Sequence, residues 1–236
     1  MPAQPYRVIA VEFARETTPR SFAPLLPPAV RDGCLRIDPL DHPDIGKAVR
    51  TIGEQADHWA LQADTGGQPA VVLGYCSGSG LASELAARLG PDTVLVLADP
   101  VFPTPAETQG LLAEMATGMD EDLDPADVPG ILGRDPDDTL AVVRTFLRSL
   151  VERCAPDLPE DIFETLTAHQ RAWMSYTLAA GAHGRTLPRR PDHVLLSAAA
   201  EWDGAAPGRA HRFPADAVGL FSHAGAAAVL AGVLAP

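Results

Sequence analysis

The sequence predicts an α/β fold: a mostly parallel central sheet flanked by helices and interrupted by a helical insertion. Three observations support this class. Continuous apolar runs, which suit strands covered on both faces, alternate with amphipathic helical segments in the first 99 residues. The alternation returns near the end of the chain. The stretch between, residues 100–190, lacks the strand pattern. Strand–helix–strand alternation is typical of parallel sheets with right-handed crossovers.

The expected strands are short runs rich in Val, Ile and Leu that end at turn residues. The expected helices have apolar residues at helical spacing, and Pro43 is tolerated because it falls in a first turn. The strands are expected over 6–13, 34–38, 70–75, 93–99, 193–199 and 209–213, and the helices over 42–64, 80–89 and 224–234.

Residues 100–190 are expected to be helical, with frequent prolines. Leu140, Val143, Leu147 and Leu150 form one apolar stripe at helical spacing. An insertion of this kind after a strand end is suited to cover a site. We therefore expect an α/β core from residues 1–99 and 191–236, and a helical lid from residues 100–190.

Composition and charge argue against several classes. The chain has 236 residues, of which 46% are hydrophobic and 21% charged, as in ordinary globular proteins. A formal net charge of −13 opposes binding to nucleic acid. The sequence contains neither a secretory signal pattern nor the roughly 18 apolar residues that span a bilayer, so we expect a cytoplasmic protein without membrane contact. Cys34, Cys76 and Cys154 are too scattered for a disulfide framework or a zinc site, and we expect no metal and no cofactor.

The segment Gly74-Tyr75-Cys76-Ser77-Gly78 has the pattern G-x-C-x-G, a nucleophile elbow with sulfur in place of oxygen. Such an elbow holds its central residue in a strained turn between a strand and a helix, and small neighbours let the backbones pass closely. The following helix contributes N–H groups and a dipole that favour a thiolate and an oxyanion. The pattern and its context predict that Cys76 is a nucleophile.

A thiol nucleophile needs a base, and the base needs an acid to orient it. His223 lies on the loop before the closing helix, where the order nucleophile, acid, histidine requires it. His211, within an expected strand, is the main rival. Two acids remain open at this point, because Asp99 ends the strand after the elbow helix and Asp203 follows the next core strand.

Four motifs resemble the thioesterase branch of the α/β-hydrolase family, the offloading and proofreading enzymes of nonribosomal peptide and polyketide synthesis. They are "YRVIAVEFARETTPRSFAPLLPP", "VVLGYCSGSGLASELAARL", "VLVLADPVFP" and "FSHAG". The resemblance covers essentially the whole chain. It implies a triad of Cys76, Asp99 and His223, and an oxyanion hole formed by the backbone N–H groups of Ser77 and Ala14.

The family usually has serine at the elbow. Cysteine occurs among its members that cyclise their substrates, including stand-alone Dieckmann cyclases. Dienelactone hydrolases are a second resemblance, since they also have G-Y-C-x-G, with a glutamate near the thiol where this chain has Glu12; they would favour Asp203 as the acid. They lack a long helical insertion after the post-elbow strand. We therefore expect the thioesterase branch.

The resemblance implies an enzyme that takes an acyl chain from a carrier protein's phosphopantetheine thioester onto Cys76 and releases it by intramolecular cyclisation. Acyl or peptidyl carrier proteins are the expected partners. Hydrolytic editing, a dienelactone-hydrolase-like reaction and a non-catalytic binding subunit are the alternatives. Arg185, Arg189 and Arg190 form a basic cluster that could receive an acidic carrier.

Overall fold

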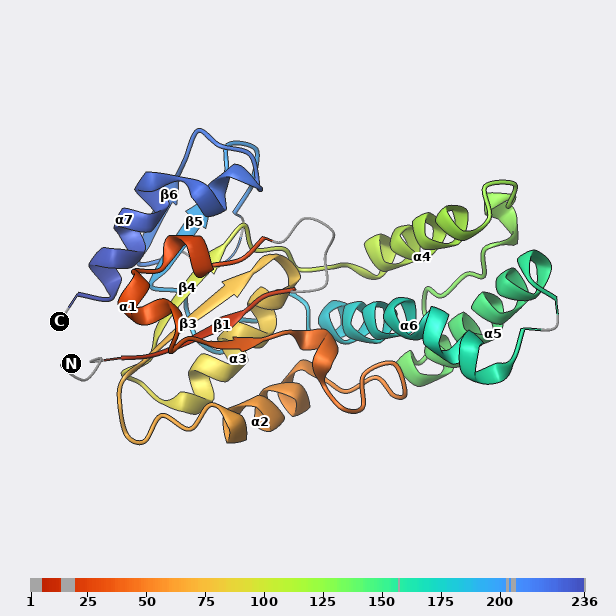
Figure 1. The fold of residues 1–236 in the computed structure, drawn as a ribbon, viewed down its shortest axis with the longest axis horizontal. Coiled ribbons are helices and arrows are strands. Elements are labelled where there is room, and N and C mark those ends of the chain that lie inside the picture. Colours follow the sequence, from red (N-terminus) through yellow and green to blue (C-terminus); the bar gives the residue numbers. More distant parts are fainter. Residues whose placement is uncertain (1–5, 14–19, 157, 203, 205–206, 236) are drawn as a thin grey trace. The chain divides into compact units, whose positions relative to one another are not determined.

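The computed structural model describes residues 6–13, 20–156, 158–202, 204 and 207–235 (Figure 1). The chain divides into two compact units. The first, here called the sheet unit, comprises Met1–Pro39, Ile52–Phe102 and Arg185–Pro236. The second, the helical unit, comprises Leu40–Thr51 and Pro103–Gly184.

The sheet unit contains a six-stranded parallel sheet with strand order β2-β1-β3-β4-β5-β6. The inner strands are buried along most of their length, as their continuous apolar runs predict, whereas β6 lies at an edge and is largely exposed. The strands are β1 (Arg7–Val11), β2 (Leu35–Ile37), β3 (Ala70–Tyr75), β4 (Val94–Ala98), β5 (His193–Leu196) and β6 (Arg209–Arg212).

The order of the strands reverses between β1 and β3. β2 joins one side of β1, and β3 joins the other side. In open α/β sheets, ligands bind at the carboxyl ends of the strands where the order reverses. Because β3 ends at Tyr75, Cys76 emerges at this point of the sheet.

Helices α2 (Ile52–Gln62) and α3 (Ser79–Leu89) pack against each other, and α3 also contacts β3 and β4 (Figure 1). Helix α7 (Ala224–Val233) packs on two short turns, η1 (Ala23–Leu25) and η5 (Gly219–Ser222). These helices lie where the sequence predicts them, apart from α2. The sheet flanked by helices confirms the predicted fold class.

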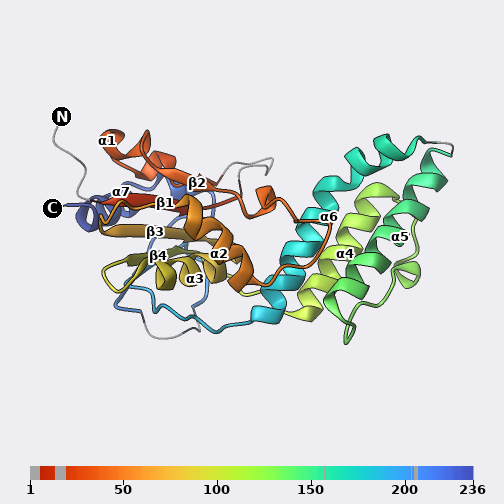
Figure 2. The ribbon, with the colours of Figure 1, turned by 90° about the horizontal axis from the view of Figure 1, so that it is seen from below.

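The helical unit is built from α4 (Pro105–Met119), α5 (Pro136–Cys154) and α6 (Glu160–His183), which form a bundle (Figure 2). The predicted apolar stripe of α5 is buried in the core of this bundle. Capping fixes where two helices begin: the Thr104 side chain accepts from Glu107 N–H, and Asp135 accepts from Asp137 N–H. None of the helices in the described residues is long and apolar enough to cross a membrane.

The helix predicted over 42–64 is correct only in its second half, because α2 begins at Ile52. The residues before it form turns, and Gly46 has a φ of 75°, which a continuing helix does not allow. The carbonyl of Ala48 accepts a hydrogen bond from Ser175 Oγ of α6 at 2.8 Å. This stretch therefore packs with the helical unit, whereas the sequence placed it in the core.

Gly74, at the end of β3, illustrates the close packing that the elbow requires. A Cβ at this position would lie 2.5 Å from Ala82 Cβ and 3.0 Å from Leu97 Cδ2. We expect Gly74→Ala to lower the free energy of unfolding by about 1–3 kcal/mol, because the strand and the helix cannot separate without cost. Urea denaturation measures this change. Gly110→Ala in α4, where a Cβ meets open space, is the control and is expected to be neutral or stabilising. Equal effects would contradict the explanation.

Candidate active site

Cys76 occupies the turn between β3 and α3. Its φ of 51° lies in the left-handed region, which non-glycine residues rarely adopt. The turn is held by its own carbonyl, which accepts hydrogen bonds from Ser79 N–H and, at 3.1 Å, from Val101 N–H. A Cβ at Gly78 would lie 3.1 Å from Val11 Cγ1, so a small residue is needed there. The thiol is on a half-buried residue that opens the short turn η3 (Cys76–Gly78) leading into α3, whose amino-terminal dipole favours a thiolate.

Asp99 emerges beside Cys76 because Tyr75 and Ala98, the residues that precede them, are partners in the parallel ladder. It is the second non-glycine residue with positive φ, at 39°, among the described residues. Its Oδ1 accepts from Ser197 N–H at 2.7 Å. Its Oδ2 is buried and has no hydrogen-bond partner among the described residues. Buried polar atoms are normally paired, so this oxygen is available to a donor that approaches the site.

His223 lies between η5 and α7, after the last strand, as predicted. Its Nδ1 accepts from Gly225 N–H at 3.1 Å and caps α7. Its ring lies 5.0 Å from that of Phe213, which directly follows β6. The structure therefore brings the loop of His223 to the carboxyl edge of the sheet, but no hydrogen bond joins Asp99 Oδ2 to the imidazole in the described part of the chain.

An aromatic contact that the sequence did not predict holds this loop against the elbow. Phe221, two residues before His223, lies edge-on to Tyr75, with ring centroids 5.0 Å apart. Phe22, which directly precedes η1, also packs against Phe221, with ring centroids 5.4 Å apart. The contact therefore holds the histidine loop against Tyr75, the residue that directly precedes Cys76. In the sequence, this contact is indicated only by an aromatic residue close to each motif: Tyr75 before Cys76, and Phe221 before His223.

Of three other predicted site residues, the structure describes one. Ser77 is buried in the elbow turn, directly after Cys76. Ala14, the predicted second oxyanion donor, lies outside the described residues. Asp203, the alternative acid, also lies outside them.

Glu12 is engaged in a network of its own at the carboxyl end of β1. Its carboxylate accepts from Phe22 N–H at 2.8 Å and from Ser21 Oγ at 3.2 Å, and it also bonds Arg36. These contacts hold the segment that follows β1. They account for the buried glutamate without the thiol contact that the dienelactone hydrolase resemblance implies.

His211, the rival histidine, is paired with His193 on the neighbouring strand. His211 Nε2 and His193 Nδ1 are 3.2 Å apart, and the two rings are stacked. Burial lowers the pKa of both histidines, and the charge of Arg209 adds to this effect. His211 lies within β6, so it does not occupy the loop position that the predicted base requires.

Two members of the basic cluster, Arg189 and Arg190, lie close to the amino end of β5 in the chain, whereas Cys76 follows the carboxyl end of β3. Arg189 donates to the carbonyl of Thr93 at 2.7 Å, just before β4 begins. Arg190 donates to the carbonyl of Pro207 at 3.5 Å. Both side chains hold loops near this end of β5. Docking of a carrier on Arg185, Arg189 and Arg190 therefore stays a prediction.

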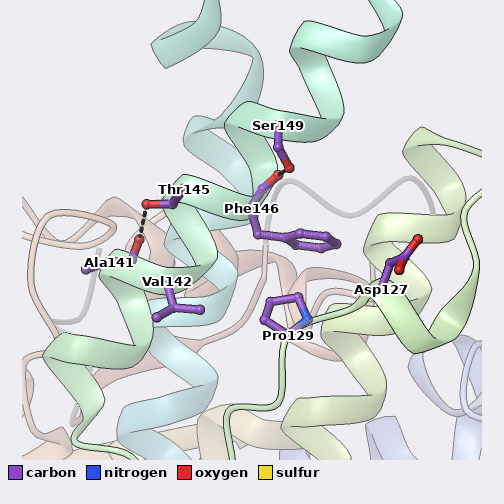
Figure 3. A pocket seen from close by; sticks show the side chains of 7 residues that line it. All are labelled: Asp127, Pro129, Ala141, Val142, Thr145, Phe146 and Ser149. Carbon is purple, nitrogen blue, oxygen red and sulfur yellow. Dashed lines mark hydrogen bonds between the residues drawn. The ribbon is translucent and has the colours of Figure 1, made fainter.

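The helical unit has a largely apolar hollow of about 420 Å³ between α5 and the segment before it (Figure 3). The Phe146 ring and Pro129 line it, with Asp127 at the side. Its lining includes the hydroxyl groups of Thr145 and Ser149 and one carboxylate, but no histidine or cysteine. Among the described residues, no group of three or more His, Cys, Asp and Glu side chains could hold a metal ion.

The second thiol provides a comparison for Cys76. Burial, with the nearby charge of Glu12, raises the pKa of Cys34 to about 11. At pH 7 only about one Cys34 in 10⁴ is then a thiolate, the form that reacts with alkylating agents. We expect iodoacetamide to label Cys76 much faster than Cys34 near neutral pH, as measured by peptide mass mapping over time. Similar rates would indicate that the elbow does not activate its thiol.

The sheet, its reversal point and the strained elbow define an α/β-hydrolase fold. The chain is similar in structure to the NocB thioesterase domain in a covalent complex with a fluorophosphonate nocardicin G analogue, with a TM-score of 0.52, 19% identity, and coverage of 98% of this chain and 95% of that one. It is also similar to the Vlm2 thioesterase domain, with 2,3-diaminopropionic acid bound with a dodecadepsipeptide (TM-score 0.50, 16% identity, 98% and 93% coverage). The acetyl esterase MekB is similar too (TM-score 0.50, 11% identity, 99% and 86% coverage). No protein-family model and no curated protein sequence matches the chain.

Proposed function

We propose that this protein is a thioesterase-like enzyme with a Cys76–His223–Asp99 triad, which releases acyl chains from a carrier protein's phosphopantetheine. The observation that carries the proposal is the elbow itself: a thiol at positive φ, with the His223 loop packed against the preceding residue. The similarity of the fold to thioesterase domains of known structure supports the same class.

In the first step, His223 takes the proton from Cys76 Sγ, and the sulfur attacks the thioester carbonyl carbon. The bond from that carbon to the phosphopantetheine sulfur breaks, and His223 returns the proton to the departing thiol. The acyl group is now a thioester on Cys76. The Ser77 N–H at the amino end of α3 is the proposed donor to the oxyanion.

In the second step, a nucleophile within the acyl chain attacks the same carbon. His223 accepts its proton, the bond to Cys76 Sγ breaks to release a ring, and His223 passes the proton to the departing sulfur so that the free thiol is restored. A thioester favours this outcome because it remains more reactive toward carbon and amine nucleophiles than an oxygen ester on serine. Water is the competing nucleophile and gives the free acid. A covering role for the helical unit, as a lid, would favour ring closure by excluding water.

The triad requires one rearrangement of the imidazole. In the structure Nδ1 accepts from Gly225 N–H, so any proton on the neutral ring is on Nε2. Catalysis requires the opposite tautomer, with Nδ1–H donated to the carboxylate and Nε2 facing the thiol. A rotation of the side chain that gives up the cap would let Nδ1–H meet Asp99 Oδ2, the oxygen left without a partner.

A release assay tests the function. A carrier protein loaded with an acyl chain that bears an internal nucleophile is mixed with the enzyme, and the products are identified by mass. The proposal predicts catalysed release, with the ring lighter than the free acid by one water. Free acid alone would refute cyclisation but keep the thioesterase. No release above the rate of the carrier alone, with several acyl chains, would refute the function.

A further inference from the structure

A second cavity, with different chemistry, lies wholly within the helical unit. Its volume is about 660 Å³, and it is bounded by the turn before α2, by α5 and by α6. Three cationic side chains line it, one from each segment: Lys47, Arg144 and Arg171. Two carboxylates accompany them, Asp137 and Glu164, so the wall has a net positive charge in a chain of net charge −13.

Both carboxylates already have partners within the protein. Asp137 Oδ1 accepts from Val49 N–H at 2.9 Å. Glu164 has one oxygen on Arg144 Nη2, at 2.7 Å, and the other on Arg171 Nη1, at 2.6 Å. Its hydrogen bond to Arg144, with the charge of Arg171, lowers the pKa of Glu164, so it stays ionised and holds both guanidinium groups in place.

The three cationic side chains have N–H donors beyond those used in these contacts. The ammonium group of Lys47, the only lysine in the sequence, makes one hydrogen bond within the described residues, to the carbonyl of Pro43 in its own turn. Arg144 uses the same nitrogen, Nη2, for both of its glutamate contacts. Arg171 is 12% exposed, and its Nε is buried without a hydrogen-bond partner in the described residues. Such a buried donor is unusual and favours an acceptor nearby.

The arrangement of these donors indicates which anion fits. Both terminal nitrogens of Arg171 are occupied by Glu164, through its carboxylate and its carbonyl. Two parallel donors on one guanidinium are a common geometry for holding a planar carboxylate, and in Arg171 both terminal nitrogens already bond Glu164. Donors that come from three separate segments suit a tetrahedral oxyanion, whose oxygens point in different directions.

We infer that this cavity is a binding site for a phosphate group, held by Lys47 and Arg144 over the buried Arg171. The phosphate can belong to a small free anion or to a phosphopantetheine arm. All of its residues belong to the helical unit, so the Cys76 thiol is not part of the site, and only the assignment to a phosphopantetheine arm rests on the proposed function.

Isothermal titration calorimetry of the full chain tests the site, in chloride buffer of fixed ionic strength. Inorganic phosphate is expected to bind saturably to the wild type and equally to Cys76→Ala. Lys47→Gln and Arg144→Gln are expected to weaken binding about tenfold or more, and Lys47→Arg to restore much of it. The matched control is Arg153→Gln. Arg153 lies on the same helix as Arg144 but outside the cavity, where it pairs with Asp120. Thermal unfolding verifies that each variant folds.

Phosphopantetheine and pantetheine distinguish the two sources. Tighter binding of phosphopantetheine than of phosphate, with none of pantetheine, would assign the site to the arm. Equal binding of phosphate and phosphopantetheine would assign it to a free anion. Absence of saturable phosphate binding would overturn the inference. So would an equal loss in Arg153→Gln, or binding of pantetheine as tight as that of phosphopantetheine.

Discussion

Cys76→Ala is expected to abolish covalent capture of an acyl chain and to lower turnover by roughly 10⁵–10⁶-fold, the scale on which a covalent enzyme loses activity without its nucleophile. The physical reason is that the strained turn presents the Cys76 thiol at the carboxyl edge of the sheet, and alanine has no atom that can attack a thioester. Intact-mass analysis after incubation with an acyl-thioester mimic measures the capture, and single-turnover release measures the rate.

Two variants make this result specific. Cys76→Ser keeps a nucleophile of similar size, and we expect slow capture as an oxygen ester, because a hydroxyl needs more help from the base than a thiol does. Cys34→Ala removes the thiol whose pKa is raised to about 11 and should leave capture unchanged. Full capture by Cys76→Ala would show that the nucleophile lies elsewhere.

Asp99→Asn is expected to lower the rate of capture by about 10³–10⁴-fold with little loss of stability. Asparagine keeps an oxygen that can accept from Ser197 N–H, so the anchor of the side chain survives. At the other position an amide NH₂ replaces Oδ2, and it cannot accept Nδ1–H from the imidazole. The histidine then loses the tautomer that catalysis requires. Stopped-flow capture, together with urea denaturation, separates the effect on chemistry from any effect on folding.

Asp192→Asn is the matched control for this change. Asp192 also accepts a backbone N–H with its carboxylate, from Leu95 at 2.9 Å, but it lies at the amino end of β5, away from Cys76. We expect its capture rate to stay within a few-fold of the wild type. If Asp99→Asn also kept a near-normal rate, Asp99 would not be the acid, and Asp203 would become the next variant to test.

The fold and the elbow could be predicted from the sequence because their signals are local. Continuous apolar runs mark the buried strands, and the two glycines around Cys76 are required by contacts with Ala82 and Val11. The choice between Asp99 and Asp203 could not be made from composition. The ladder pairing beside Cys76, and an Oδ2 that is buried without a hydrogen-bond partner among the described residues, support the proposal of Asp99, whereas Asp203 lies outside those residues.

Features that depend on contacts between segments far apart in the chain could not be predicted from the sequence. Residues near Gly46 have apolar spacing that suits a helix, but they pack as turns on the helical unit. The contact of Phe221 with Tyr75 joins two segments that no periodicity connects. In the structure the His223 ring accepts from Gly225 N–H, whereas the proposed triad needs it to donate to Asp99. The sequence motif does not indicate which of these partners the ring takes.

The most direct test of the central claim is to locate the acyl group after capture. The wild type is incubated briefly with an acyl-thioester mimic, quenched in acid and digested, and the modified residue is identified by tandem mass spectrometry. The account predicts a single acylated residue, Cys76. An acyl group on Ser77 or on Cys34 instead, or no acylated peptide while turnover proceeds, would contradict it.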